Sequence, residues 1–250
     1  MVRKILQIGC QELTNISSPV KFPLSAEDKK TIADLLDTAK DVGDKGAGLS
    51  APQLAINKRV TVCRRVDIEE LIYSLNNKLL ISEELKSSPT EFVKALIDNS
   101  NMVFGGEIDK IQKHFNLKVS EKKLNKSELN ELFKKVDDLL WMVVIDPEVT
   151  FENDYETIYW EGCLSVGAGK TALYAPVART EIITFTYFDT DGQKHEMKTK
   201  NYFAHVVLHE IDHMEGVLFL SRVDNIENIW KAEELDNYIK AHKKYPEIKD

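Results

Sequence analysis

Cysteine is scarce in this chain of 250 residues, and the three copies lie far apart as Cys10, Cys63 and Cys163. A disulfide framework requires an even number of closely spaced cysteines, so a small secreted scaffold is excluded. No apolar run approaches the ~20 residues that a membrane-spanning helix requires, so we expect no membrane partner. The opening segment MVRKILQIG shows neither an apolar signal region nor an Arg- and Ser-rich leader, and we expect a cytoplasmic location.

A surplus of basic residues is also lacking. Lysine and arginine number 33 against 41 aspartates and glutamates, which gives a formal net charge of -8. Binding to a phosphate backbone requires a basic face, so we expect no specific nucleic acid partner. Internal repeats and low-complexity tracts are absent as well. What the chain does have is 43% apolar residues, enough for the core of one large domain or two small ones.

Several segments alternate apolar and polar residues or are rich in β-branched residues, which is typical of strands. We predict strands over residues 2–8, 59–66, 141–151, 182–188 and 194–199. Asp191-Gly192 predicts a hairpin turn between the last two strands. Ser25 followed by Asp28 indicates a helix start, and a final helix is expected near 225–243. Antiparallel strands mixed with helices predict an α+β fold.

The segment 67–140 differs from its surroundings because about a third of its residues are charged. Its apolar residues fall on one helical stripe near its end, at Leu129, Leu132, Phe133, Val136, Leu139 and Leu140. Ser88-Pro89-Thr90-Glu91 is typical of a capped helix start with a first-turn proline. We therefore expect one domain, 1–250, that carries a helical insertion at 67–140.

The segment AHVVLHEIDHMEG (204–216) places His209 and His213 four residues apart. Positions i and i+4 project from the same face of a helix, so the two imidazoles can bind one metal ion. Glu210 lies about 100° around the helix, where a general base for water activation belongs. The pattern also occurs by chance on surface helices, so the metal site depends on a third ligand.

The other histidines are poor candidates for the third ligand. His205 precedes His209 by one turn, but a straight helix cannot wrap three successive turns around one ion. We expect His205 to be a helix-face residue, and His114, His195 and His242 to be solvated.

Cys163 is a better candidate, since Gly162 before it lets the backbone approach closely and Glu161 adds an anion nearby. A thiolate beside two imidazoles would give a tetrahedral site with one open position. Cys10 and Cys63 are expected to be small core residues.

Three motifs now stand in order along the chain: GAGLSAPQ (46–53), within a predicted glycine-rich loop at 43–53, EGCLS (161–165) and HEIDH (209–213). Together they resemble the signature motifs of the peptide deformylases. KILQIGCQELTNISSPV and VVIDPEV also resemble segments of that family, so the similarity covers most of the chain outside 67–140. The resemblance implies antiparallel sheets packed around a central metal-binding HExxH helix. It also implies hydrolysis of the N-formyl group from the formylmethionine of new polypeptides, with release of formate and transient proximity to the ribosome.

The resemblance also implies a set of site residues. Cys163, His209 and His213 would hold one divalent ion, with Fe²⁺ expected and Zn²⁺, Ni²⁺ or Co²⁺ as alternatives. Glu210 would carry the proton from water to the leaving nitrogen, while the Gln53 amide and the Leu164 backbone N–H would stabilise the negative oxygen. The residues expected at the substrate are Gly48, Leu49, Gly162, Tyr202, His205 and Val206. Arg179 and Asp212 resemble a charged pair that braces the metal helix.

The chain departs from the family pattern in several places. Leu208 stands where the family has glutamine, Ser50 replaces an alanine, and the loop after EGCLS is longer. The insertion is the largest departure, and we interpret it as a lid or a docking surface. Two alternatives remain: a zinc endopeptidase whose third ligand is Glu215 or Glu227, and a catalytically weak relative whose insertion serves binding.

Overall fold

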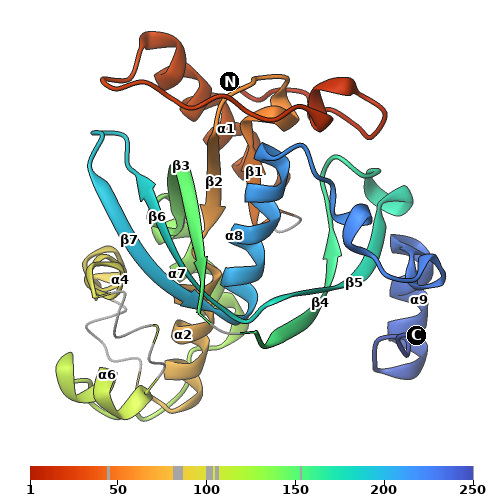
Figure 1. The fold of residues 1–250 in the computed structure, drawn as a ribbon. Helices are drawn as coiled ribbons and strands as arrows, with labels where there is room; N and C mark the ends of the chain where they lie inside the picture. Colours follow the sequence, from red (N-terminus) through yellow and green to blue (C-terminus); the bar gives the residue numbers. More distant parts are fainter. Residues whose placement is uncertain (44–45, 81–86, 100–103, 105–106, 153, 250) are drawn as a thin grey trace.

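The computed structural model describes the whole chain except residues 44–45, 81–86, 100–103, 105–106, 153 and 250. Helix α8 (Asn201–Met214) lies at the centre, with a larger sheet on one side and a smaller sheet on the other (Figure 1). The α+β prediction is confirmed. Within the described part of the chain, every helix is too short or too polar to reach across a bilayer.

The larger sheet is antiparallel and has the strand order β1-β2-β3-β6-β7. Its strands are β1 (Gly48–Ser50), β2 (Val60–Arg64), β3 (Trp141–Phe151), β6 (Ile182–Phe188) and β7 (Lys194–Lys200). The smaller sheet has the order β4-β5-β8, with β4 (Glu156–Gly162), β5 (Leu173–Thr180) and β8 (Trp230–Lys231). The predicted hairpin is confirmed, since β6 pairs with β7 across the Asp191-Gly192 turn.

Alternation along the strands divides the core between two faces of the larger sheet. Val62 and Ile145 pack toward α1 (Ala26–Val42), whereas Cys63 and Val144 pack toward α8. Because successive side chains of a strand point to opposite faces, a single apolar strand serves both layers. Helix α1 starts as expected, with a capping box between Ser25 and Asp28.

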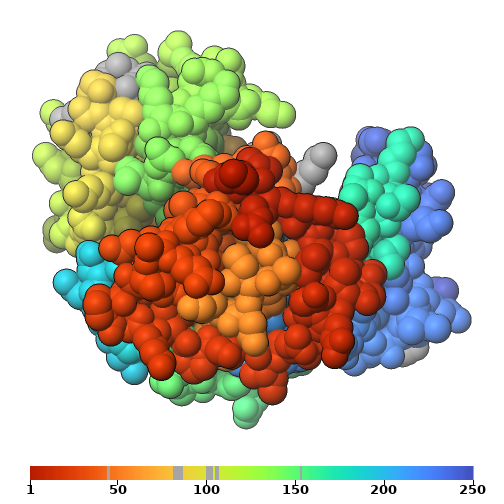
Figure 2. Space-filling view, turned by 90° about the horizontal axis from the view of Figure 1, so that it is seen from above, coloured from red at the N-terminus to blue at the C-terminus, as the bar shows by residue number. Residues whose placement is uncertain are grey.

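The segment between β2 and β3 is helical, with α2 (Val66–Asn77), α4 (Pro89–Asp98), α6 (Ile108–His114) and α7 (Lys126–Val136). It has an apolar cluster of its own, to which all four helices contribute. Helix α4 begins at Pro89 as predicted, but Ser88 makes no capping hydrogen bond with its side chain. Figure 2 shows these helices and the carboxyl-terminal part as two lobes on either side of the amino-terminal segment. The division into one domain with an insertion at 67–140 stays a prediction.

Three predicted elements differ from the structure. Residues 2–8 form no strand; instead Leu6 N–H donates to the Gln53 carbonyl at 2.8 Å and Ile8 N–H to the Ser165 carbonyl at 2.7 Å. The expected loop at 43–53 contains β1 and a 3-10 helix (Ala51–Leu54). The last helix, α9 (Ala232–His242), starts later than expected because Trp230–Lys231 pairs with β5. The amino-terminal segment thus ties together the loops that carry two of the motifs.

Candidate active site

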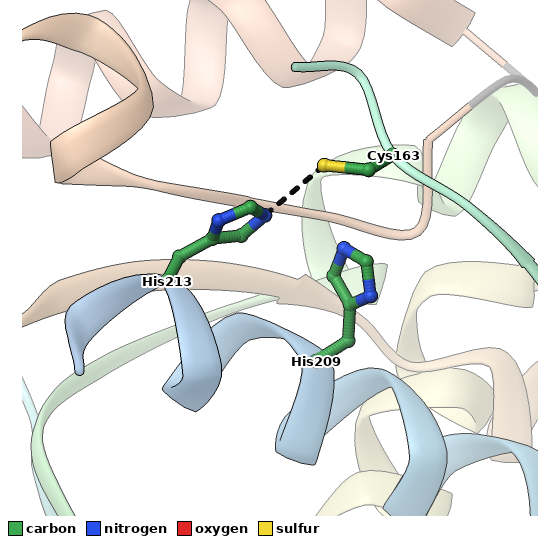
Figure 3. Close-up of side chains that lie close together, drawn as sticks. All are labelled: Cys163, His209 and His213. Carbon is green, nitrogen blue, oxygen red and sulfur yellow. Dashed lines mark hydrogen bonds between the residues drawn. The ribbon is translucent and has the colours of Figure 1, made fainter. Parts of the chain in front are cut away.

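Three side chains from distant parts of the chain converge at the centre of the molecule (Figure 3). The ligand atoms of Cys163, His209 and His213 all lie within 4.8 Å of one another, and the Cys163 Sγ lies 3.2 Å from His213 Nε2. No other group of three or more His, Cys, Asp or Glu side chains is spaced for a metal ion among the residues that the structure describes. A thiolate with two imidazoles is a donor set suited to a transition metal.

The histidine rings are prepared for metal binding by their surroundings. His209 Nδ1 lies 2.9 Å from Glu161 Oε2, which leaves the other ring nitrogen for an ion. Burial holds the pKa of His213 well below its usual range, and the charges of His209 and Arg179 add to this effect. The neutral imidazole is the form that binds metals, which suits His213. For His209, burial lowers the pKa, but the hydrogen bonds to Cys163 and Glu161 outweigh it and raise the pKa well above its usual range. The buried Nδ1 of His213 has no partner in the described structure. The nitrogen suited to bind a metal ion is therefore Nε2, which faces the Cys163 sulfur.

Local sequence explains how the sulfur reaches this place. Cys163 follows directly after β4, which ends at Gly162 and pairs with β5. A Cβ at Gly162 would lie 2.5 Å from the ring of Tyr174, so only glycine lets the two strands come together here. His209 and His213 come from the same face of α8, as the four-residue spacing predicts.

Glu210 lies beside this cluster on the side of β1. Its carboxylate is buried, and Oε2 accepts hydrogen bonds from Ser50 Oγ at 2.6 Å and Thr61 Oγ1 at 3.3 Å. Burial raises the pKa of Glu210, and the charge of His209 opposes that rise. A Cβ at Gly48 would overlap the carboxylate, so glycine makes room for it. Sequence reasoning missed Thr61 and treated Ser50 as a minor change.

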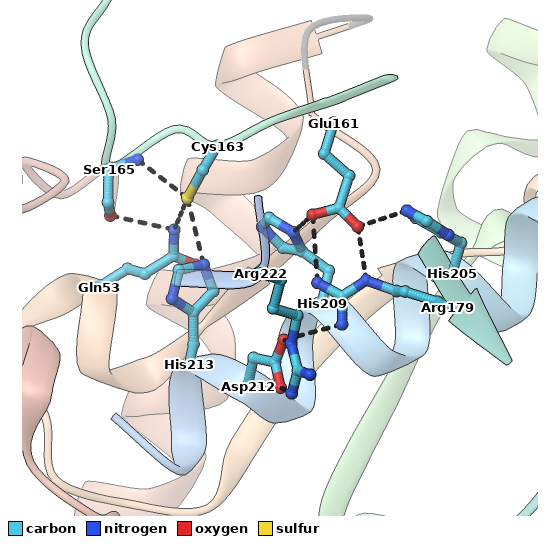
Figure 4. Close-up of polar contacts among 10 residues, drawn as sticks. All are labelled: Gln53, Glu161, Cys163, Ser165, Arg179, His205, His209, Asp212, His213 and Arg222. Atoms are coloured by element: carbon cyan, nitrogen blue, oxygen red, sulfur yellow. Dashed lines mark hydrogen bonds and ion pairs between the residues drawn. The ribbon is translucent and has the colours of Figure 1, made fainter. Parts of the chain in front are cut away.

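Gln53 and the turn after Cys163 lie close together beside the sulfur (Figure 4). Gln53 Nε2 donates to Ser165 Oγ at 3.1 Å and lies 3.7 Å from Cys163 Sγ, while its Oε1 accepts from Ser50 N–H at 2.8 Å. The Leu164 carbonyl accepts from Gln7 Nε2 at 2.9 Å. Gln7 and Ser165 lie within the quoted motif segments, but their contacts with Leu164 and Gln53 join residues more than 100 positions apart and were not foreseen.

A buried charged network supports α8 from the side of β4 and β5 (Figure 4). Glu161 accepts from Arg179 Nε at 2.5 Å and contacts both His205 and His209. Burial opposes ionisation of Glu161, but these hydrogen bonds outweigh it and hold the pKa of its carboxyl well below its usual range. The expected pair of Arg179 and Asp212 is present at 2.7 Å.

Two residues of this network differ from expectation. Arg222 was not foreseen, yet it also donates to Asp212, at 2.5 Å through Nε. His205 is not a simple helix-face residue, because it is only 2% exposed and its Nε2 contacts Glu161.

A cavity of about 1240 Å³ opens beside the cluster. Its lining includes Cys163, His209, Glu210 and Gln53, and five of the expected substrate residues: Gly48, Gly162, Tyr202, His205 and Val206. Leu49 is the exception, because its side chain is fully buried in the apolar core beside α1 and it does not line the cavity. The acids of the peptidase alternative lie elsewhere: Glu215 pairs with Arg59, and Glu227 pairs with Lys249 at 2.9 Å.

An α+β frame with a buried carboxylate beside two imidazoles and a thiol is typical of a metal-dependent hydrolase. The model of the polypeptide deformylase family matches residues 2–95 and 108–228, so the chain belongs to that family. The function is accordingly that of a peptide deformylase, a metal-dependent hydrolase whose substrates are formylated peptides. The family match omits 96–107, which lie between β2 and β3.

Individual relatives agree with this assignment. The chain is 26% identical over 239 residues to a peptide deformylase of Shouchella clausii, covering 91% of this chain and 92% of the relative. It is 25% identical over 242 residues to that of Rhizorhabdus wittichii, covering 97% and 98%.

The fold is also shared with solved structures. A peptide deformylase from Legionella pneumophila has a TM-score of 0.56 at 21% identity, covering 98% of this chain and all of that one. A Met-Ala-Ser-bound class I type b peptide deformylase from Acinetobacter baumannii has a TM-score of 0.55 at 19% identity, covering 89% and 99%.

Proposed function

We propose that this enzyme removes the formyl group from N-formylmethionyl peptides and releases formate, with Cys163, His209 and His213 holding its metal ion. The single observation that carries the proposal is the convergence of these three ligand atoms within 4.8 Å, with Glu210 buried beside them. A pure binding protein has no need of the buried carboxylate, which favours catalysis over the weak-relative alternative.

A divalent ion in this place would supply Lewis acidity, which polarises the formyl carbonyl and makes water a better nucleophile at neutral pH. We propose Fe²⁺ as the ion, with Zn²⁺, Ni²⁺ or Co²⁺ as alternatives, because thiolate and imidazole donors suit all four. Glu161 orients the ring of His209 from behind, and Arg179 holds Glu161 in place.

Glu210 is the proton carrier in this proposal. Its carboxylate takes the proton of the attacking water and passes it to the nitrogen that leaves with the peptide. The raised pKa brings the carboxyl closer to neutrality, where a group can both accept and return a proton. Ser50 and Thr61 hold Oε2, which fixes the direction of the other oxygen.

The negative charge that develops on the formyl oxygen needs donors already in position. Two donors are proposed. Gln53 Nε2 lies 3.7 Å from the Cys163 sulfur, and the backbone N–H of Leu164 belongs to the residue directly after Cys163. Loss of one such donor typically costs about 3–4 kcal/mol of transition-state stabilisation. Ser50 and Ser165 hold the Gln53 amide in place beside the Cys163 sulfur.

The peptide itself would lie along β1, which is the edge strand of the larger sheet and borders the cavity through Gly48. Addition of an extended peptide to a sheet edge supplies backbone hydrogen bonds without regard to sequence. Tyr202, His205 and Val206 would contact the first side chain. We place the reaction in the cytoplasm, in transient proximity to the ribosome, where formylated chains emerge.

The test is release of formate from formyl-Met-Ala-Ser under anaerobic conditions, with metal content measured on the same samples. The wild-type protein should bind about one metal ion per chain and turn over the peptide. Cys163→Ser should lose both metal and turnover while keeping its fold by circular dichroism. Metal retained in Cys163→Ser would support the peptidase ligand set instead, and a metal-loaded wild type without formate release would refute the enzyme assignment.

A further inference from the structure

A second cavity, of about 760 Å³, adjoins the one at the candidate active site. The two cavities share Gly46, Ala47 and Tyr202 in their linings. The rest of the second lining comes from β2 and from the helices between β2 and β3. A ligand that leaves the active site past these three shared residues therefore enters a space walled by the insertion.

One face of each of two helices lines this space. Val66, Glu69 and Tyr73 are spaced by three and four residues on α2. Asn130, Phe133 and Lys134 have the same spacing on α7. Residues three and four apart share a helix face, so both helices turn a continuous surface toward the cavity. The rings of Tyr73 and Phe133 lie 5.2 Å apart and form its aromatic part.

The charged groups of the lining are already paired with acids. Arg64 donates to Asp137 at 2.6 Å and to Glu69 at 2.8 Å. Lys134 pairs with Glu131 at 3.1 Å. The aromatic surface stays accessible, since Tyr73 is 46% exposed, and the Lys134 side chain is itself 74% exposed. A charged ligand would have to compete with the pairs of the less exposed Arg64, whereas an uncharged aromatic or large apolar side chain gains by covering the rings.

The edge of β1 connects the two spaces. β1 pairs with β2 on one side only, and it ends the sheet order, so its other edge is available to an extended chain. Gly46 and Ala47 immediately precede β1 and border both cavities. A peptide with its formyl end at Cys163 and its chain along β1 continues into the second cavity.

We propose that the second cavity is a subsite for an uncharged aromatic or large apolar side chain of the formylated peptide, downstream of the residues held in the main cavity. The inference rests on the proposed function of the first site, and it gives the insertion a role in selecting substrate chains. The occupant is the same peptide that reacts, because the shared lining residues place the second cavity directly beside the first.

The test compares formyl-Met-Ala-Ser with hexapeptides that carry one phenylalanine at position three, four, five or six in an alanine and serine background. One phenylalanine position should raise kcat/KM of the wild type about 5- to 20-fold over the hexapeptide without phenylalanine, as expected for burial of one aromatic ring. Tyr73→Ser should lose most of this ratio. Tyr155→Ser is the matched control, since Tyr155 is 74% exposed and lines neither cavity, and it should keep the ratio.

A flat phenylalanine scan in the wild type would overturn the subsite, and so would a ratio that survives Tyr73→Ser unchanged. Binding of the unformylated product peptides, measured by titration calorimetry on the same variants, reports the subsite without turnover. If formyl-Met-Ala-Ser is not hydrolysed, the proposed function fails, but a phenylalanine-dependent affinity lost in Tyr73→Ser would still identify the subsite. Affinity independent of phenylalanine would remove the subsite as well.

Discussion

Two regions of the molecule bury very different kinds of side chain. One is the frame, by which we mean α8, the two sheets and α1; the other is the group of helices between β2 and β3. The frame buries Glu161, Arg179, Asp212 and Glu210 in its centre, each with polar partners. Among the described residues of 67–140, the one buried polar side chain is Asn76, which bonds the backbone of Leu124 through both its oxygen and its nitrogen. Buried charge is costly unless it is paired, so each of these groups in the frame depends on its polar partners.

The largest expected effect is at Glu210, where substitution should abolish most of the activity without lowering the stability. Glu210→Gln keeps the shape of the side chain but removes the proton carrier, so kcat should fall about 100- to 10,000-fold. The melting temperature should stay the same or rise, because a buried ionisable group is replaced by a neutral one.

Steady-state kinetics and thermal unfolding at matched metal content provide the measurement for Glu210→Gln. A variant that melts much earlier than the wild type would show that the carboxylate is structural, and the proposed contrast between the two regions would fail.

Arg179 tests whether the buried charges of the frame depend on one another. Arg179→Met removes the cation between Glu161 and Asp212, whose remaining partners include His205, His209 and Arg222. We expect a loss of about 3–5 kcal/mol in the free energy of unfolding, as for other broken buried ion pairs. Denaturant unfolding measures it. Arg222, which also pairs with Asp212, is partly exposed, and Arg222→Met is the control. An equal loss of unfolding free energy in Arg222→Met would show that Arg179 is not the central partner of the buried carboxylates.

Leu75 tests the apolar side of the comparison. It is fully buried in the apolar cluster of the helices between β2 and β3, and Leu75→Ala should destabilise that cluster by about 2–4 kcal/mol. Hydrogen exchange should show the loss mainly in α2, α4 and α7, with α8 protected as before. Faster exchange in α8 to the same extent would mean that the helices between β2 and β3 unfold together with the frame as one unit.

Local patterns predicted much of this molecule, and long-range contacts explain what they missed. The spacing of His209 and His213 predicted a shared helix face, because that relation lies within one turn. The hydrogen bond from Ser50 to Glu210 joins residues 160 positions apart, and no local pattern encodes it. Residues 2–8 alternate like a strand, yet they bond two loops instead of a sheet edge. β1 has only three residues, too few for a periodic signal.

Ser50 gives a smaller and more specific effect on activity. Ser50→Ala removes the 2.6 Å hydrogen bond to Glu210, so the carboxylate loses its fixed direction and kcat should fall about 3- to 10-fold with little change in KM. Ser17→Ala is the matched control, because Ser17 is also buried but its hydroxyl has no partner in the described structure. Equal effects of the two substitutions would indicate a packing defect instead of lost positioning.

The smallest effect is a difference in the pH response of the two regions. In the frame, Lys30 lowers the pKa of Asp34 most, burial opposes it, and Arg3 and the amino terminus help Lys30. This stabilisation is present above the unfolded-state pKa of ~3.9 and is lost as the pH falls below it.

In α2, burial raises the pKa of Glu70, and the charges of Asp67 and Glu69 raise it further. Glu70 therefore destabilises the fold at neutral pH, and acidification toward its raised pKa relieves that cost. Unfolding free energies measured between about pH 7 and pH 3 should show a weaker acid loss in Asp34→Asn than in the wild type. Glu70→Gln should instead stabilise the protein at neutral pH, with a gain that shrinks as the pH falls. For each variant, the difference in unfolding free energy from the wild type is plotted against pH. If these two differences changed with pH in the same direction, the opposite electrostatic environments of Asp34 and Glu70 would be contradicted.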